Sequence, residues 1–358
     1  MERFLSYLTA FAVTLTAIWF YMPVAYRIGL LDCPGGRKCH DGAIPLVGGI
    51  AMFTGLLFAI LSLPVAIDEY RALIAGMALM VAMGVMDDLK ELSARIRFIA
   101  QIIAALLMLL WGEIMLESLG KAFHNESVAL GAWSIPFTIF AVVGVINATN
   151  MTDGVDGLAG SMVLVILSAF AVVAAIAGLE SDVLVLLCVI ATVLAFLCFN
   201  FPIPGRAQAK VFMGDGGSMF LGFVIAWFGV SLTQGEHAAI SPTTALWIIG
   251  LPILDTIAIM TRRVMRGRSP FSPDREHFHH ILQVAGFGRS KIVIVMMMIS
   301  GLLAGIGITG ELLGVPEYIM FYGYVIVLGV YFWGVMHAWK VMKAIKKVDA
   351  MTRSERSE

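Results

Sequence analysis

Five aspartates stand where long apolar segments of this 358-residue chain end or begin. Asp87 and Asp88 close one apolar run, Asp153 and Asp156 follow another, and Asp215 precedes a third. An ionisable side chain at the end of an apolar span is costly to bury and indicates function by default. A single such aspartate could equally be a water-exposed interfacial residue. Five of them, with Asn147 and Asn150 beside the middle pair, predict a site.

The ligand chemistry of these oxygens suits a hard divalent cation. Magnesium takes one or two carboxylates and completes its shell with water and substrate phosphates, so aspartates from different segments and an asparagine carbonyl fit it. The four cysteines form no zinc-type cluster with histidine: Cys33, Cys39, Cys188 and Cys198. We therefore expect Mg²⁺, with Mn²⁺ as a substitute, and a phosphorylated substrate.

Two further motifs fit such a substrate. "GDGGS" begins a span, where free backbone N–H groups favour an anion, and Phe212 just before it could stack on a base or simply anchor the interface. A later segment carries arginines and then "HFHH", which could bind a metal but fits a diphosphate clamp better. Its candidate residues are Arg262, Arg263, Arg275, His277, His279 and His280, and Lys38, His40 and Arg97 could add to the same positive field.

Composition excludes an ordinary soluble globule. The chain is 59% hydrophobic and 14% charged, its mean hydropathy is +0.90, and its net charge of −1 gives no indication of a nucleic-acid partner. Continuous apolar runs favour helices over a barrel. The fold class expected is all-α, a polytopic membrane bundle in one domain (1–345) with a basic, disordered cytoplasmic tail (346–358). The expected spans are 4–26, 46–67, 71–86, 96–118, 132–148, 158–178, 183–200, 216–233, 243–262, 291–310 and 318–339.

Charge in the loops predicts the orientation of these eleven spans. The first segment lacks the features of a cleaved signal peptide and is expected to remain as the first span. The Lys- and Arg-rich tail places the C-terminus in the cytoplasm and the N-terminus outside. Only Arg3, Arg71 and Lys121 of the 24 basic residues then fall on the outer face. All the polar motifs converge on the cytoplasmic face, which predicts one active site there.

The motifs, taken together, resemble a known family. "RKCHDGAIPLVGG", "DDLKE", "NATNMTDGVDGLAG", "KVFMGDGGS", "SPTTALWIIGLPILD" and "SPFSPDREHFHH" occur in the order found in the polyprenyl-phosphate N-acetylhexosamine-1-phosphate transferases, over about residues 20–345. The resemblance is closest to the bacterial branch that opens O-antigen and common-antigen type polysaccharide synthesis in the inner membrane. It implies a magnesium-dependent transfer of N-acetylglucosamine 1-phosphate from UDP-N-acetylglucosamine to undecaprenyl phosphate, with release of UMP.

The resemblance also implies roles for individual residues. Asp215 and Asn150 match the magnesium ligands, and Asp87 and Asp88 match an acidic pair whose first member is often proposed to act on the lipid phosphate. The other implied contacts are Asp156 and Phe212 with uracil, Asp153 and Arg97 with the phosphates, and the "HFHH" loop with the nucleotide sugar. Glu91 departs from the pattern, since relatives commonly carry aspartate or another short polar residue there.

Several alternatives stay open. The donor could be UDP-N-acetylgalactosamine or a muramoyl-pentapeptide nucleotide, and a covalent aspartyl intermediate is a minority option. A homodimer is one option for assembly. The rival class is an ion-coupled transporter, although transporter acids lie near the midplane between related halves, and this sequence shows no repeat.

Overall fold

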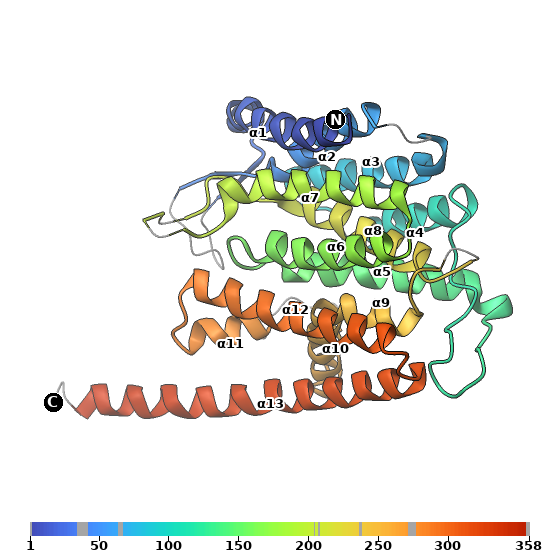
Figure 1. The fold of residues 1–358 in the computed structure, drawn as a ribbon. Coiled ribbons are helices and arrows are strands. Elements are labelled where there is room, and N and C mark those ends of the chain that lie inside the picture. The colour runs from blue at the N-terminus through green and yellow to red at the C-terminus, as the bar shows by residue number, and fades with distance from the viewer. Residues whose placement is uncertain are drawn as a thin grey trace.

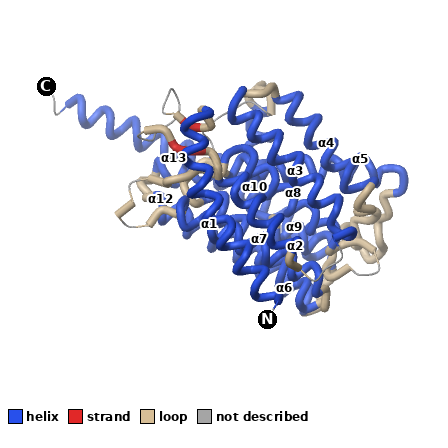
Figure 2. Tube along the Cα trace, turned by 90° about the horizontal axis from the view of Figure 1, so that it is seen from above, coloured by secondary structure: helices blue, strands red, loops and turns tan. Residues whose placement is uncertain are grey.

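The computed structural model describes residues 2–33, 42–63, 67–203, 205–206, 208–235, 238–270 and 277–355, and leaves the side chains of residues 2, 67 and 339–355 undescribed. It is a bundle of helices whose longer members run side by side (Figures 1 and 2). The helices are α1 (Glu2–Ile28), α2 (Gly48–Leu61), α3 (Ile67–Lys90), α4 (Ala94–Leu110), α5 (Ser134–Thr152), α6 (Leu158–Ile176), α7 (Glu180–Asn200), α8 (Gly214–Ser231), α9 (Pro242–Ile248), α10 (Gly250–Met265), α11 (Phe278–Val284), α12 (Arg289–Leu312) and α13 (Glu317–Glu355), with a short 3-10 turn, η1 (Gly131–Trp133).

Strand structure in the described residues is limited to one short antiparallel pair. β1 (Leu31–Asp32) and β2 (Ile44–Pro45) pair between α1 and α2. The expected all-α class is therefore confirmed.

The expected spans fall on helices of very different length. Within the described residues, seven helices are long and apolar enough to cross a membrane, or eight if one bent pair counts as a single span. They support a multi-pass membrane protein, while the count of eleven stays a prediction. The remaining expected spans correspond to α2 and α4, which are short, and to α8. α13 continues to Glu355, into the segment expected to form the basic tail.

The expected span 243–262 falls on two helices with a sharp bend between them. α9 and α10 meet at an angle of 81° near Ile249 and Gly250, and α10 lies across the direction of the other helices (Figure 1). Pro252 explains the break, because it lacks the N–H that would continue the helical hydrogen bonds from α9. The bend turns the polar C-terminal half of α10 toward the loop that carries the histidines.

α8 forms the centre of the bundle, with nearly every residue buried among α2, α3 and α5. Glycines permit this burial. A Cβ on Gly84 of α3 would collide with the backbone of Asp215 and Gly216, and a Cβ on Gly49 of α2 would lie 2.5 Å from the Cα of Gly217. Gly48 and Gly49, at the start of α2, therefore permit close packing. These crossings bring the end of α3 against the start of α8.

Candidate active site

The aspartate pair at the end of α3 is held by hydrogen bonds. Asp87 is buried, its Oδ1 accepts from the backbone N–H of Leu92 at 2.7 Å, and its Oδ2 accepts from Arg97 Nη1 at 3.0 Å. Asp87 thus joins the end of α3 to the first turn of α4. Glu91 lies between them in the left-handed conformation, with φ of 48° and an exposed side chain. Aspartate and asparagine tolerate that conformation better than glutamate.

Asp88 and Asp215 meet where α3 crosses α8. Both carboxylate oxygens of Asp88 accept from the backbone N–H of Asp215 at 3.1 Å. Asn150, at the end of α5, donates from Nδ2 to Asp215 Oδ1 and to Ser218 Oγ, both at 2.8 Å. Arg97 Nη1 lies 3.8 Å from Asp215 Oδ2. Residues from α3, α4, α5 and α8 thus form one connected cluster, as the sequence predicted.

The donor set of this cluster fits magnesium. Asp215 keeps about a third of its side chain exposed, and one or two carboxylates are enough for this ion. A turn of the Asn150 amide about its last torsion exchanges nitrogen for oxygen, and the two atoms are assigned only by their hydrogen-bond partners. The described residues contain no group of three or more His, Cys, Asp or Glu side chains arranged as a metal site. The donor set therefore suits a cation shared with a substrate better than a closed structural site.

The loop after α5 carries the other two aspartates. Asp153 follows the last residue of α5 and is exposed. Asp156 Oδ2 accepts from Ala209 N–H and from Arg289 Nη1, each at 3.1 Å. Arg289, which begins α12, was not among the residues predicted from the sequence.

Two further residues fix the shape of this loop. Gly157 adopts a φ of 78° before α6, and its N–H donates to Asn200 Oδ1 at 2.7 Å. A Cβ on Gly154 would lie 2.5 Å from His279 Nε2. The loop after α5 is therefore packed directly against the histidine segment.

The three histidines gather at the start of α11. The rings of His277 and His279 are stacked with centroids 5.5 Å apart, and His280 lies 4.2 Å from His279. His279 is fully buried, and desolvation, followed by His280 and His277, lowers its pKa to about 3. Its ring is therefore neutral at physiological pH. Arg262 and Arg263 are also buried, and Arg263 Nη1 donates to the Pro270 carbonyl at 2.6 Å.

Of the remaining residues predicted for the site, the structure describes Phe212 but not three basic residues. Phe212 is half-buried and lies three residues before Asp215. Its backbone N–H donates to the carbonyl of Pro45 in β2, and its carbonyl accepts from the N–H of Gly48 at the start of α2. Lys38, His40 and Arg275 lie outside the described residues.

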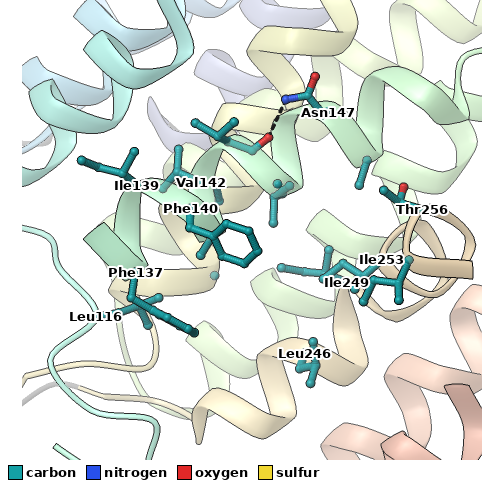
Figure 3. A pocket seen from close by; sticks show the side chains of 18 of the residues that line it. Leu116, Phe137, Ile139, Phe140, Val142, Asn147, Leu246, Ile249, Ile253 and Thr256 are labelled. Atoms are coloured by element: carbon teal, nitrogen blue, oxygen red, sulfur yellow. Dashed lines mark hydrogen bonds between the residues drawn. The ribbon is translucent and has the colours of Figure 1, made fainter. Parts of the chain in front are cut away.

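A large apolar pocket adjoins the polar cluster. Its volume is about 990 Å³, and it runs between α4, α5, α9 and α10. In Figure 3, Phe137 and Phe140 face Ile249 and Ile253 across the hollow, and Asn147 lies at one end. The polar residues among those lining the pocket include Arg97, Asn150, Arg263 and His277.

Asn147, which the sequence left unassigned, bonds within the bundle. Its Nδ2 donates to Gln101 Oε1 at 2.7 Å and to the Val143 carbonyl at 2.8 Å. Gln101 is buried and packs on α8 through Met219. Asn147 therefore ties α5 to α4.

Fold and site define an integral-membrane helical bundle in which a carboxylate cluster meets an apolar pocket. Residues 70–233 match glycosyl transferase family 4. The chain is 38% identical over 350 residues to an undecaprenyl-phosphate alpha-N-acetylglucosaminyl 1-phosphate transferase of Salmonella typhi, covering 98% of this chain and 95% of the relative. Proteins of the same name from Yersinia pestis and Escherichia coli K12 are 39% and 37% identical, over 96% and 98% of this chain and 94% and 95% of theirs. The chain belongs to this family of membrane glycosyl transferases, which confirms the resemblance seen in its motifs.

Proposed function

We propose that the protein transfers N-acetylglucosamine 1-phosphate from UDP-N-acetylglucosamine to undecaprenyl phosphate, releasing UMP. The observation that carries this proposal is the junction of two environments: Arg97 and Asn150 belong to the carboxylate cluster and also line the apolar pocket. A polyprenyl chain fits the pocket and its phosphate fits the polar end. The relatives' shared name supports the same donor sugar and acceptor.

The acceptor phosphate is itself the nucleophile. A phosphate monoester with a second pKa near 6 is largely dianionic at pH 7, so no group has to remove a proton before it attacks the β-phosphorus of the donor. Phosphoryl transfer of this kind depends on positioning and charge neutralisation. Asp87 has both oxygens engaged, by Leu92 and Arg97. We therefore assign it the placement of Arg97 near the phosphates rather than general-base chemistry.

The other groups divide between metal and donor. Asp215 and Asn150 would hold Mg²⁺, with Asp88 fixing the backbone beneath Asp215. A bound magnesium ion would supply charge neutralisation to the diphosphate. Asp156 and Phe212 would contact the nucleoside of the donor, and Asp153 would lie near its phosphates. The histidines and the buried arginines would contact the phosphates and the sugar.

The proposed function also includes an orientation of the protein in the membrane and a biosynthetic route for its product. The site faces the cytoplasm, where nucleotide sugars are available, with eleven membrane segments, an outer N-terminus and a cytoplasmic C-terminus. In Figure 1, α11 and the start of α6 lie at the end of the bundle toward which the C-terminal helix extends. The product would start O-antigen or common-antigen type polysaccharide synthesis.

One assay tests the proposal against its rivals. Purified protein in detergent should release UMP from UDP-N-acetylglucosamine only when both undecaprenyl phosphate and Mg²⁺ are present. Folded protein that gives no UMP under these conditions contradicts the enzyme and favours the transporter class. A panel with UDP-N-acetylgalactosamine and the muramoyl-pentapeptide nucleotide identifies the donor. Exchange of labelled UMP into donor without acceptor would indicate a covalent intermediate instead of direct attack.

A further inference from the structure

A buried carboxylate outside the acidic cluster makes three hydrogen bonds near the histidines. Asp255, in the middle of α10, is 6% exposed. Its Oδ2 lies 2.7 Å from Nδ1 of His277, and its Oδ1 accepts from the backbone N–H of Phe278 at 3.1 Å and from the hydroxyl of Tyr331 at 2.8 Å. The three donors come from the loop before α11, from α11 itself and from α13.

The packing of a helical membrane bundle does not require a buried carboxylate at this position. Burial of a charge among membrane helices is unfavourable unless partners compensate for it, and an apolar side chain of similar volume usually packs as well. Asp255 is compensated by donors from two other elements, so its position in α10 fixes the start of α11. Asp255 holds the ring of His277 most directly, through the contact between Oδ2 and Nδ1.

The hydrogen bond determines which nitrogen of His277 is left for a ligand. With a carboxylate at Nδ1, the proton of the neutral ring resides on Nδ1, and Nε2 lies on the other side of the ring. Within the described residues Nε2 has no hydrogen-bond partner, and His277 lines the pocket beside Arg263. Carboxylates that orient a ligand-binding histidine through its second nitrogen are a recurrent arrangement at functional sites.

We propose that Asp255 and Tyr331 are positioning residues that hold His277 with Nε2, the acceptor nitrogen of the ring, directed to a hydroxyl or amide N–H group of the nucleotide-sugar donor. The inference rests on the proposed function, in which the histidines bind that donor. Asp255 touches no substrate and acts through His277. Tyr331 holds the carboxylate from α13, so the C-terminal span takes part in donor recognition through one hydroxyl.

A double-mutant cycle tests whether Asp255 acts through His277. Asp255→Asn should lower kcat/KM for UDP-N-acetylglucosamine about 10- to 100-fold, the usual cost of losing such an orienting partner, and leave KM for undecaprenyl phosphate unchanged. In a His277→Ala background the same substitution should cost less than about twofold, because the ring that Asp255 orients is gone. Equal costs in the two backgrounds would overturn the proposal.

Tyr331 offers a gentler variant with a matched control. Tyr331→Phe removes only the hydroxyl and should lower donor kcat/KM about threefold to tenfold. Tyr324 is also buried on α13, and its hydroxyl donates to the Gly250 carbonyl of α10 at 3.2 Å without contacting Asp255. Tyr324→Phe should therefore leave donor kinetics unchanged. Equal losses in the two variants would show a general packing effect and refute a positioning role.

A spectroscopic measurement is independent of activity. In protein labelled with ¹⁵N-histidine, the His277 signal, assigned with His277→Gln, should report a protonated Nδ1, and Asp255→Asn should alter it. A wild-type spectrum with the proton on Nε2 alone would overturn the inference. Wild-type protein that shows the expected signal but releases no UMP would refute the proposed function and leave the Asp255–His277 arrangement standing.

Discussion

Gly84 is the position where the site depends most directly on packing. α3 and α8 cross there so closely that a Cβ on Gly84 would collide with main-chain atoms of Asp215 and Gly216. Asp88, one turn further along α3, binds the backbone N–H of Asp215 through both oxygens. Gly84→Ala therefore forces apart the two helices that carry the acidic cluster, without altering any group that touches a substrate.

The size of the effect follows from contact distances. Non-bonded heavy atoms pack at about 3.5–4.0 Å, so the helices must separate by about 1.5 Å to admit the methyl group. Overpacking costs about 1–3 kcal/mol, and here the colliding atoms are backbone and cannot rotate away. Alanine regains about 0.5–1 kcal/mol of helix preference, which leaves a net loss of about 2 kcal/mol. A displacement of about 1 Å in catalytic groups lowers the rate about 100-fold.

Two measurements check this prediction. Thermal unfolding in detergent should show the loss of stability, and UMP release should show the loss of rate in the fraction that remains folded. Gly329→Ala is the matched control, because Gly329 lies in α13 with nothing near its missing Cβ. Gly84→Ala with stability and rate within twofold of that control would refute the argument that this crossing positions Asp88 and Asp215.

Three other predictions concern separate parts of the site. Phe140→Ala should raise KM for undecaprenyl phosphate about tenfold, because a large apolar contact with the polyprenyl chain is lost. KM for UDP-N-acetylglucosamine should stay unchanged. A change in the KM of the donor alone would show that the pocket binds the donor instead. The pKa of His279 is about 3 in the folded protein and about 6.5 in the unfolded chain. As the pH falls, the unfolded chain therefore takes up a proton at His279 before the folded protein does. Stability should therefore fall from about pH 6.5 downward, by up to about 2 kcal/mol at pH 5, and His279→Gln but not His124→Gln should remove this slope in melting curves. Asp87→Asn should lower kcat by a factor that stays constant with pH, and recovery of the rate above about pH 7 would show a general base instead.

Much of the architecture could be predicted because hydropathy and helix formation act locally. An apolar run in a membrane must be helical to satisfy its backbone, so each expected span falls on a helix. The bend between α9 and α10 was missed because the run 243–262 is apolar throughout. Pro252 was the local signal for it, although a proline alone does not distinguish a small kink from a turn of 81°.

The acidic cluster was predictable for a different reason. Its members interrupt apolar sequence, so each stands out without knowledge of the fold. Asp255 interrupts α10 in the same way, but its partners His277 and Tyr331 lie 22 and 76 residues away and come from other elements. Arg289 resembled any basic residue at the start of an apolar helix. Only the packing of α12 against α6 brings it to Asp156.

The five aspartates divide into two groups by their hydrogen bonds. Some shape the site, and the others can contact substrates. Asp87 accepts hydrogen bonds from Leu92 and Arg97, and Asp88 accepts from the backbone of Asp215. These bonds join the end of α3 to the starts of α4 and α8. A dianionic phosphate needs no proton acceptor before it attacks. The acidic pair is then best understood as the support for Arg97 and Asp215, the two groups that face the phosphates. This division explains why a reaction without a general base would still depend on both aspartates.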